Sequence, residues 1–403
     1  MSIGRSGRRI AAAGLVVALA LLAVLAAHAL LRRPKPPRVT WAVKQTRDAA
    51  RALMDTYYDA GLGILTRYPI PAQTGSDAAG ADALADPGEP AALWGYSWGL
   101  AALEDAAQLP GGKSLLPVVR ALANHLFYYW DAGAAVPGYA PTFAPGAGAV
   151  KFFDDNAWAG LDLMGAYRMT GDAVYLRQAE AVFAYEETGW DPEGGGIFWN
   201  DQRTIRNAVS NAPVAELAVY LYRETGKATY LTWAERIFRW EVAHLVDQRT
   251  GEVYENIDAH GQVSRQMWTY NQGTLVGAAV LLYDATRKPP YLVQARQTAA
   301  YALHAGVRAD GALVPPAEFN GVLADDLQLL YQQTRASAIR RAIATNASIA
   351  WTRARSSRNL FASDWQGPPP ATSGLPLLTQ TGAVRLLAVN AALASGGFSG
   401  LRL

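Results

Sequence analysis

"AYRMTGDAVYLRQAEAVFAY", at residues 166–185, contains the pattern that decides the fold of this chain. Two further copies, at 221–240 and 282–301, keep a tyrosine that is followed eight residues later by a second tyrosine and then a leucine. A weaker copy has Tyr331 and Ile339 at these two places. In every copy, apolar residues recur at helical spacing on both sides of a short break that contains Gly, Thr or Pro. Each copy therefore predicts a helix, a tight turn and a second helix.

The same pattern, traced outward from these copies, predicts twelve helices and no long strand. Their ranges are 41–60, 92–108, 112–130, 155–169, 172–188, 207–225, 227–246, 271–287, 289–306, 320–335, 337–354 and 378–396. Short connections inside each hairpin alternate with long ones between hairpins. Six such hairpins predict an all-α protein with a closed double ring of helices, an (α/α)6 toroid, in which the first helix packs beside the last. All long loops then fall on one face, before the inner helices, and we expect that face to carry the function.

The N-terminal sequence predicts a segment that is separate from the helical domain. Arginines precede an uncharged run from Ile10 to Leu31, which at about 1.5 Å per residue is long enough to cross a bilayer core of roughly 30 Å. We expect an uncleaved single-pass anchor with the following domain outside the cytoplasm; the alternative is a signal peptide, cleaved near Ala27-His28-Ala29, and secretion. The predicted organisation is a signal-anchor segment at 1–33, a proline-rich linker at 34–40 and the helical domain at 41–403.

Composition excludes several classes of function. A net charge of +2 over 403 residues gives no basic face for nucleic acid. The chain has no cysteine, which rules out disulfides and thiolate metal sites, and its five histidines include no i, i+4 pair. We therefore expect no metal site built from cysteine or histidine. We also expect a monomer.

Four motifs with chemically versatile side chains map to the long-loop face. They are "FFDDNAW" (152–158), "GWDPEGGGIFWN" (189–200), "RNAVSN" (206–211) and "MWTYNQG" (267–273). Tryptophan and tyrosine rings cover the apolar C–H faces of sugars, while carboxylates and amides bind hydroxyl groups. This composition is typical of a carbohydrate-binding surface.

Asp154 and Asp155 leave two interpretations open on the residues alone. Acidic residues at a helix start cap free amides and favour the helix dipole. Two adjacent carboxyls in a pocket instead tend to split their titration, which supplies the ionised group and the protonated group that glycoside hydrolysis needs. A second pair, Asp325 and Asp326, lies inside a predicted helix without aromatic neighbours, and we interpret it as structural.

The ordered motifs resemble glycoside hydrolase family 76, the endo-α-1,6-mannanases. The resemblance rests on "DDNAWAGLDLMGAYRMTGDAVYL" (154–176), "GGGIFWN" (194–200), "NAVSNAPVAELAVYLYRETG" (207–226) and "WTYNQGTLVGAAVLLY" (268–283). It covers residues 90 to 300 and weakens beyond them, although 346–365 still echoes the family. The resemblance implies an (α/α)6 toroid that hydrolyses α-1,6-linked mannan with retention of configuration and without cofactor or metal.

Carried over residue by residue, the resemblance makes Asp154 the nucleophile and Asp155 the general acid/base. It also implies sugar contacts, for which the candidates are Asn207, Asn211, Tyr270, Asn271 and Gln272, with Trp158 and Trp199 as aromatic platforms. Packing is the alternative for Trp158. Glu255 and Asn256 stand where family members often carry aspartate and glycine, which puts the substrate contacts on that side in doubt.

Three functions remain open at this stage. A retaining α-1,6-mannanase is the leading hypothesis. A cell-envelope mannan transglycosylase and a non-catalytic glycan-binding protein are the alternatives. The sequence does not distinguish endo from exo action, and it does not identify the source of the mannan.

Overall fold

The computed structural model describes residues 41–69, 88–146, 148–369 and 375–395. The predicted anchor and linker lie outside these residues. The described part contains twelve α-helices that form two sets. The inner set is α4 (Leu93–Gln108), α6 (Phe153–Thr170), α8 (Ala212–Thr225), α10 (Thr269–Thr286), α12 (Ala317–Thr334) and α14 (Leu377–Ser395). The outer set is α2 (Trp41–Tyr57), α5 (Leu116–His125), α7 (Ala173–Thr188), α9 (Ala228–Leu245), α11 (Pro289–Ala305) and α13 (Ser337–Arg353).

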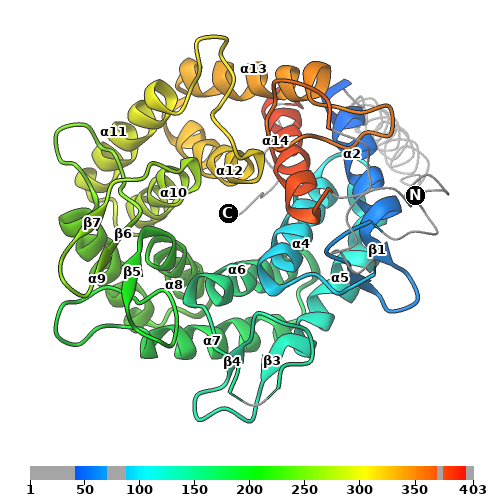
Figure 1. Ribbon diagram of the computed structural model, residues 1–403. Helices are drawn as coiled ribbons and strands as arrows, with labels where there is room; N and C mark the ends of the chain where they lie inside the picture. Colours follow the sequence, from blue (N-terminus) through cyan, green and yellow to red (C-terminus); the bar gives the residue numbers. More distant parts are fainter. Residues whose placement is uncertain (1–40, 70–87, 147, 370–374, 396–403) are drawn as a thin grey trace, which may run out of the picture. The chain divides into compact units, whose positions relative to one another are not determined.

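The inner helices close into a ring, and the outer helices surround it (Figure 1). Each inner helix packs against the next, from α4 through α14, and α14 returns to pack against both α4 and α2. The predicted contact between the first and last helices is therefore confirmed. Among the described helices, α14 has the length and apolarity of a membrane span, but 83% of its most apolar window is buried, so it is a core helix of the ring.

The first tyrosine of each repeat marks the end of an inner helix. The N–H of Gly171 donates to the carbonyl of Tyr167 (2.7 Å), and the N–H of Gly226 donates to the carbonyl of Tyr222 (2.8 Å). Both glycines are left-handed, with φ of 71° and 70°, a conformation that ends a helix at little cost when the residue lacks a Cβ. This explains the tight turn that the sequence pattern predicts.

The second tyrosine links neighbouring outer helices. The hydroxyl of Tyr230 on α9 donates to Glu180 on α7, and that of Tyr291 on α11 donates to Glu235 on α9, both at 3.0 Å. Tyr175 on α7 donates in the same way to Asn124 on α5 (2.9 Å). The repeat therefore encodes contacts within a hairpin and contacts to the hairpin before it.

The long loops contain short antiparallel strands that the sequence pattern did not predict. They form the pairs β1 (Tyr58–Asp59) with β2 (Ile64–Leu65) and β3 (Trp130–Asp131) with β4 (Gly138–Tyr139), and a sheet of β5 (Ile205–Asn207), β6 (Asn256–Asp258) and β7 (Val263–Ser264). Strands of two or three residues have no detectable period, and β5 in addition pairs with a strand that is distant in the sequence, β6.

Some predicted helices are longer than the observed ones, because short strands or 3₁₀ turns take the place of α-helix at their ends. The helix predicted from residue 207 begins at Ala212, because Ile205–Asn207 pairs with β6 and Ala208–Ser210 forms a 3₁₀ turn (η4). The helix predicted at 112–130 is α only over Leu116–His125, with 3₁₀ turns at Gly112–Leu115 (η2) and Leu126–Tyr129 (η3).

Candidate active site

Asp154 and Asp155 lie in the first turn of the inner helix α6, on the long-loop face. The helix begins at Phe153, so Phe152 holds the N-cap position and neither aspartate does. Both aspartates are half-buried, whereas the flanking Phe153 and Asn156 are fully buried. Phe153 stacks on Tyr185 of α7 at 4.7 Å between ring centroids, which fixes the start of α6 against the outer ring. The pair is thus presented by a rigid helix end and does not serve as its cap.

The two aspartates differ in their electrostatic surroundings. Burial raises the pKa of Asp154 to about 7, although hydrogen bonds from backbone amides and from the Trp199 indole oppose that rise. Trp199 Nε1 donates to Asp154 Oδ2 at 3.3 Å. Burial, and then the negative charge of Asp154, raise the pKa of Asp155 well above its ordinary value. Asp154 therefore ionises first, and its charge helps Asp155 to retain a proton.

Glu255 is a third carboxyl at the site, which the sequence analysis noted only as a departure from the family pattern. Its side chain accepts hydrogen bonds from Asn271 Nδ2 at 2.5 Å and from Asn207 Nδ2 at 3.4 Å. Burial raises the pKa of Glu255, and its charge contributes to the raised pKa values of Asp154 and Tyr270. Two predicted site residues, Asn207 and Asn271, therefore converge on a carboxyl that also faces Asp154.

Asn211 and Gln272 contact loop backbone. Asn211 is fully buried and bonds both the N–H (2.8 Å) and the carbonyl (3.1 Å) of Ile197. Gln272, also fully buried, does the same with Val253, at 2.9 and 2.8 Å. These amides hold a long loop onto the start of an inner helix, and their contact with sugar stays a prediction.

The predicted aromatic platforms separate into one packed ring and one at the site. Trp158 is 2% exposed and packs edge-on against Trp98, with centroids 5.6 Å apart, so the packing alternative describes it. Trp199 is half-buried beside Asp154. Tyr270 is 9% exposed and stacks on Phe319 at 4.1 Å.

The sequence analysis missed a group of half-buried aromatic residues at the starts of inner helices. Trp94 opens α4, Trp268 is the N-cap of α10, and Phe319 lies in the first turn of α12. Phe319 contacts both tryptophans, at centroid distances of 6.4 and 5.4 Å. The signal that could have found them is the position of each ring within the first turn of a helix assigned to the inner set.

Asp325 and Asp326 lie at the middle of α12, away from its loop-face end. Arg385 of α14, fully buried, donates through Nε to Asp325 (2.7 Å), and its Nη2 contacts the same carboxylate. Asp105 lies 3.8 Å from the same guanidinium. The structural interpretation of this pair agrees with a buried ion cluster that joins α4, α12 and α14.

The described residues hold no group of three or more His, Cys, Asp or Glu side chains arranged to bind a metal ion. One ionised carboxylate beside one protonated carboxyl, with aromatic rings around them, is the arrangement that a glycosidic bond requires for nucleophilic attack and leaving-group protonation.

Solved structures share this fold. The α-1,6-mannanase GH76A of Salegentibacter sp. HEL1_6 superposes with a TM-score of 0.73 at 25% identity, over 87% of this chain and 99% of that one. A family 76 mannosidase of Bacteroides thetaiotaomicron superposes with a TM-score of 0.78 at 23% identity, over 88% and 99% of the two chains.

Curated relatives match a shorter stretch. Mannan endo-1,6-alpha-mannosidase DFG5 of Saccharomyces cerevisiae is 34% identical over 151 residues, which is 33% of this chain and 33% of the relative. Mannan endo-1,6-alpha-mannosidase DCW1 of Candida glabrata is 32% identical over 151 residues, 33% of this chain and 34% of that one. The chain thus spans about a third of the length of the curated relatives it matches.

The family model for glycosyl hydrolase family 76 matches residues 44–396. The match therefore extends well beyond the residues 90 to 300 on which the sequence resemblance rests, and it includes α2, α13 and α14. With the closed ring, the aspartate pair on its loop face and a family match over most of the sequence, this chain belongs to glycosyl hydrolase family 76.

Proposed function

We propose that this protein is an endo-α-1,6-mannanase that cleaves mannan with retention of configuration. Family membership supports hydrolysis of a glycosidic bond. The Salegentibacter α-1,6-mannanase, whose inactive variant with two consecutive aspartates replaced by asparagine was solved with α-1,6-mannotriose, supports the linkage and the role of an aspartate pair. The yeast relatives carry the same specificity in their names.

The observation that carries the proposal is the aspartate pair in the first turn of α6, in which Asp154 ionises before Asp155. In the first step, Asp154 attacks the anomeric carbon and forms the mannosyl-enzyme ester. Asp155 gives its proton to the departing glycosidic oxygen, so the C–O bond breaks as a neutral alcohol leaves. The hydrogen bond from Trp199 stabilises Asp154 as an anion, and the charge of Asp154 keeps the proton on Asp155.

In the second step the roles of Asp155 reverse. As a carboxylate it removes a proton from water, the resulting oxygen attacks the anomeric carbon, and Asp154 leaves as the carboxylate. Two displacements at one carbon restore the original configuration. Since the pKa of Asp154 is about 7, we expect kcat/KM to rise with pH through about 7 and to fall again when Asp155 loses its proton.

The remaining site residues have roles in binding by the same reasoning. Glu255, oriented by Asn207 and Asn271, is a hydrogen-bond acceptor for mannose hydroxyls next to the nucleophile. Trp199, Trp94 and Trp268 offer half-buried ring faces for the apolar side of the sugars. Tyr270 packs on Phe319, and Asn211 and Gln272 hold loops in place, so these three residues support those that face the sugar.

Incubation of the protein with linear α-1,6-mannan, followed by sizing of the products, tests the proposal. A ladder of oligosaccharides is the expected result, and mannose alone would show exo action.

NMR detection of the first anomer released should show the α-anomer. An added oligosaccharide acceptor, with mass spectrometry of the products, separates hydrolysis from transglycosylation, and binding without any cleavage would contradict enzymatic function.

We further propose that residues 1–33 anchor the enzyme in the membrane with the helical domain outside the cytoplasm. The uncharged run Ile10 to Leu31 and the arginines before it support this location. Fractionation of cells should place the full chain in membranes after a carbonate wash. A shortened chain in the medium would support the cleaved and secreted alternative.

A further inference from the structure

Arg206 is a buried cation that the proposed chemistry does not use. It is 9% exposed and lies in β5, between Ile205 and Asn207. Successive side chains of a strand point to opposite faces, and Asn207 reaches Glu255 at the site. Arg206 therefore points away from the site, into the space between loop 189–200 and α9. A buried guanidinium is stable only when its donors find acceptors.

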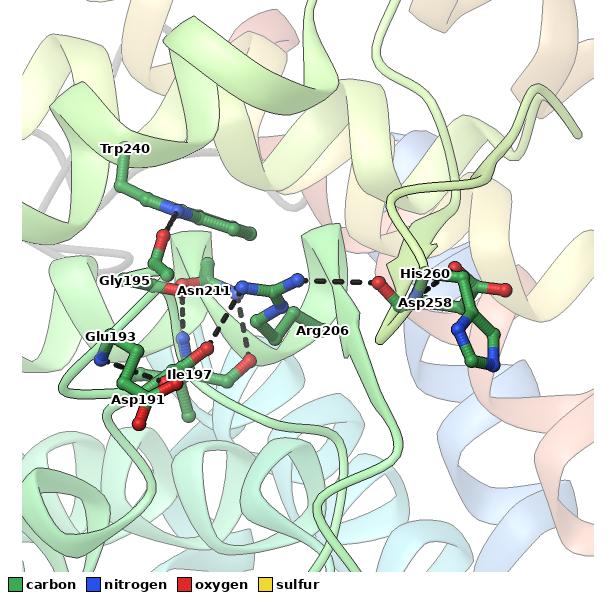
Figure 2. Close-up of polar contacts among 10 residues, drawn as sticks. Asp191, Glu193, Gly195, Ile197, Arg206, Asn211, Trp240, Asp258 and His260 are labelled. Carbon is green, nitrogen blue, oxygen red and sulfur yellow. Dashed lines mark hydrogen bonds and ion pairs between the residues drawn. The ribbon is translucent and has the colours of Figure 1, made fainter.

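Those acceptors come from two separate parts of the chain (Figure 2). Arg206 Nη1 donates to Asp191 Oδ2 at 2.9 Å and to the carbonyl of Gly195 at 3.2 Å. Nη2 donates to the carbonyl of Asp258, at the end of β6, at 3.3 Å. The guanidinium also lies 5.7 Å from the ring centroid of Trp240 on α9. One side chain thus ties the turn at 191–195 to β6.

The three consecutive glycines at 194–196 make this contact possible. A Cβ on Gly194 would lie 2.3 Å from Arg206 Nη1, and a Cβ on Gly195 or Gly196 would lie 2.6 or 2.5 Å from the ring of Trp240. The last two glycines also have φ of 70° and 79°. The "GGG" of the loop motif therefore serves the approach of Arg206 and Trp240 to the backbone.

The parts that Arg206 joins carry two residues that interact with Asp154, Trp199 through a hydrogen bond and Glu255 through its charge. Trp199 follows the glycine turn, and its N–H donates to the carbonyl of Ile205 (2.8 Å), next to Arg206. Glu255 directly precedes β6, and its carbonyl accepts from the N–H of Ala208 (2.9 Å). Movement of the loop or of β6 would therefore displace the Trp199 indole or the Glu255 carboxyl relative to Asp154.

We propose that Arg206 is a positioning residue that locks loop 189–200 to β6 and so holds Trp199 and Glu255 at the working distance from Asp154. The inference rests on the proposed mannanase function for its kinetic consequence, but its structural consequence is independent of any activity. Displacement of a positioned group by about 1 Å can reduce a rate by about 100-fold.

The kinetic test compares Arg206→Ala and Arg206→Lys with a matched control. Arg308→Ala removes another Arg–Asp pair between loops of the same face, with Asp364 at 2.8 and 3.0 Å, remote from Asp154 in the chain and in contacts. We expect Arg206→Ala to reduce kcat/KM on α-1,6-mannan by about 10- to 100-fold, mainly in kcat. Arg206→Lys should restore part of the loss, and Arg308→Ala should stay within about 2-fold of the wild type.

The pH profile separates positioning from simple loss of stability. Asp154 is faced by the titratable groups Asp155, Glu255, Glu186 and Tyr270, and none of these is altered by the substitution. Loss of the Trp199 hydrogen bond removes an interaction that lowers the pKa of Asp154, and displacement of Glu255 removes a smaller interaction that raises it. The acid limb of kcat/KM should therefore move to higher pH in Arg206→Ala. A lower melting temperature with an unchanged acid limb would overturn the inference.

Hydrogen–deuterium exchange supplies the readout that does not depend on substrate. Arg206→Ala should increase exchange in peptides that cover 189–207 and 255–264 and leave 306–316 unchanged, and Arg308→Ala should give the opposite pattern. If wild-type protein fails to cleave mannan but this exchange pattern appears, the proposed function is wrong and the positioning role stands. If mannan is cleaved but Arg206→Ala matches wild type in exchange or in kcat/KM, the positioning role is wrong. Should Arg206→Ala fail to fold, Asp191→Asn removes only the negative charge of one partner of Arg206 and should give the same changes at smaller amplitude.

Discussion

The protein contains two Asp-Asp pairs on inner helices, and the two pairs do opposite things. Asp154 and Asp155 lie in the first turn of α6, half-buried, with no cation within salt-bridge distance in the described residues. Asp325 and Asp326 lie deep in α12, buried, where Arg385 pairs with Asp325. Two adjacent carboxyls at a helix start with no cation nearby have raised pKa values. The same two residues beside a buried arginine form part of an ion cluster in the core. The two pairs have the same sequence, and their position along the helix decides their role.

The largest expected effect concerns the pair on the loop face. Asp154→Asn and Asp155→Asn should each reduce kcat on linear α-1,6-mannan by about 10³-fold or more, because each removes a group to which the proposed mechanism assigns bond making or breaking. The unfolding free energy should change little or increase, since a partly buried charge is removed. Initial rates and denaturant unfolding check both outcomes, and wild-type turnover in either variant would contradict the comparison.

The core pair should respond in the reverse order. Asp325→Asn removes the principal partner of a fully buried arginine and should lower the unfolding free energy by about 3–5 kcal/mol. The fraction that remains folded should cleave mannan at the wild-type rate. Urea unfolding and activity per folded molecule measure the two quantities, and a selective loss of kcat with normal stability would place the core pair at the site.

A smaller effect is expected from the indole that touches Asp154. Trp199→Phe keeps a ring but removes the hydrogen bond to Asp154 Oδ2, so the pKa of Asp154 should rise and the acid limb of kcat/KM should move upward by roughly half a pH unit. Trp158→Phe is the matched control: it alters a packed indole and should lower the melting temperature without moving the limb. Equal shifts in both variants would show that the limb reports stability.

The smallest effect concerns two equivalent buried glutamates. Glu186 on α7 and Glu241 on α9 occupy the same place in the repeat, are fully buried, and have pKa values that burial raises well above normal. Because the folded state binds these protons more tightly than the unfolded chain, the stability they contribute is present below the ordinary carboxyl range and is lost as pH rises through the raised pKa.

Glu241→Gln should therefore melt on the order of 2 °C above wild type at pH 9 and equal it at pH 4. Glu186→Gln should behave alike, although the charge of Asp154 adds to the raised pKa of Glu186. Scanning calorimetry across pH 4–9 makes the comparison, and a gain at acid pH would reverse the assigned sign.

Much of the fold could be predicted from the sequence because it is periodic. The apolar spacing of the tyrosine repeat, traced outward, predicted the twelve helices, their order and the face of the long loops. The second tyrosine of the repeat makes the same kind of contact between neighbouring outer helices in each copy. The strands β5 and β6 escaped prediction because their pairing joins residues about fifty positions apart. Glu255 was noticed as an unusual residue but not as a site residue, since its place beside Asp154 arises only from that pairing.

The predicted sugar contacts separated for a physical reason. An amide in a motif looks the same in the sequence whether it bonds loop backbone or a carboxyl at the site, and only the hydrogen-bond partners in the fold distinguish the two. Asn211 and Gln272 proved fully buried against loop backbone, while Asn207 and Asn271 orient Glu255. Trp94 and Phe319 lay outside the quoted motifs, because a lone aromatic residue in an apolar helix looks like core.

The buried amides at the starts of the inner helices also bear on how this surface can change over evolution. Asn156, Asn211 and Gln272 each grip one backbone residue of the preceding loop, at Tyr139, Ile197 and Val253, through its N–H and its carbonyl. These hydrogen bonds involve only the backbone of the loop and do not depend on its side chains. Side chains of these loops can therefore change without loss of this grip, whereas the loops that carry β5 and β6 have to change together because the two strands pair.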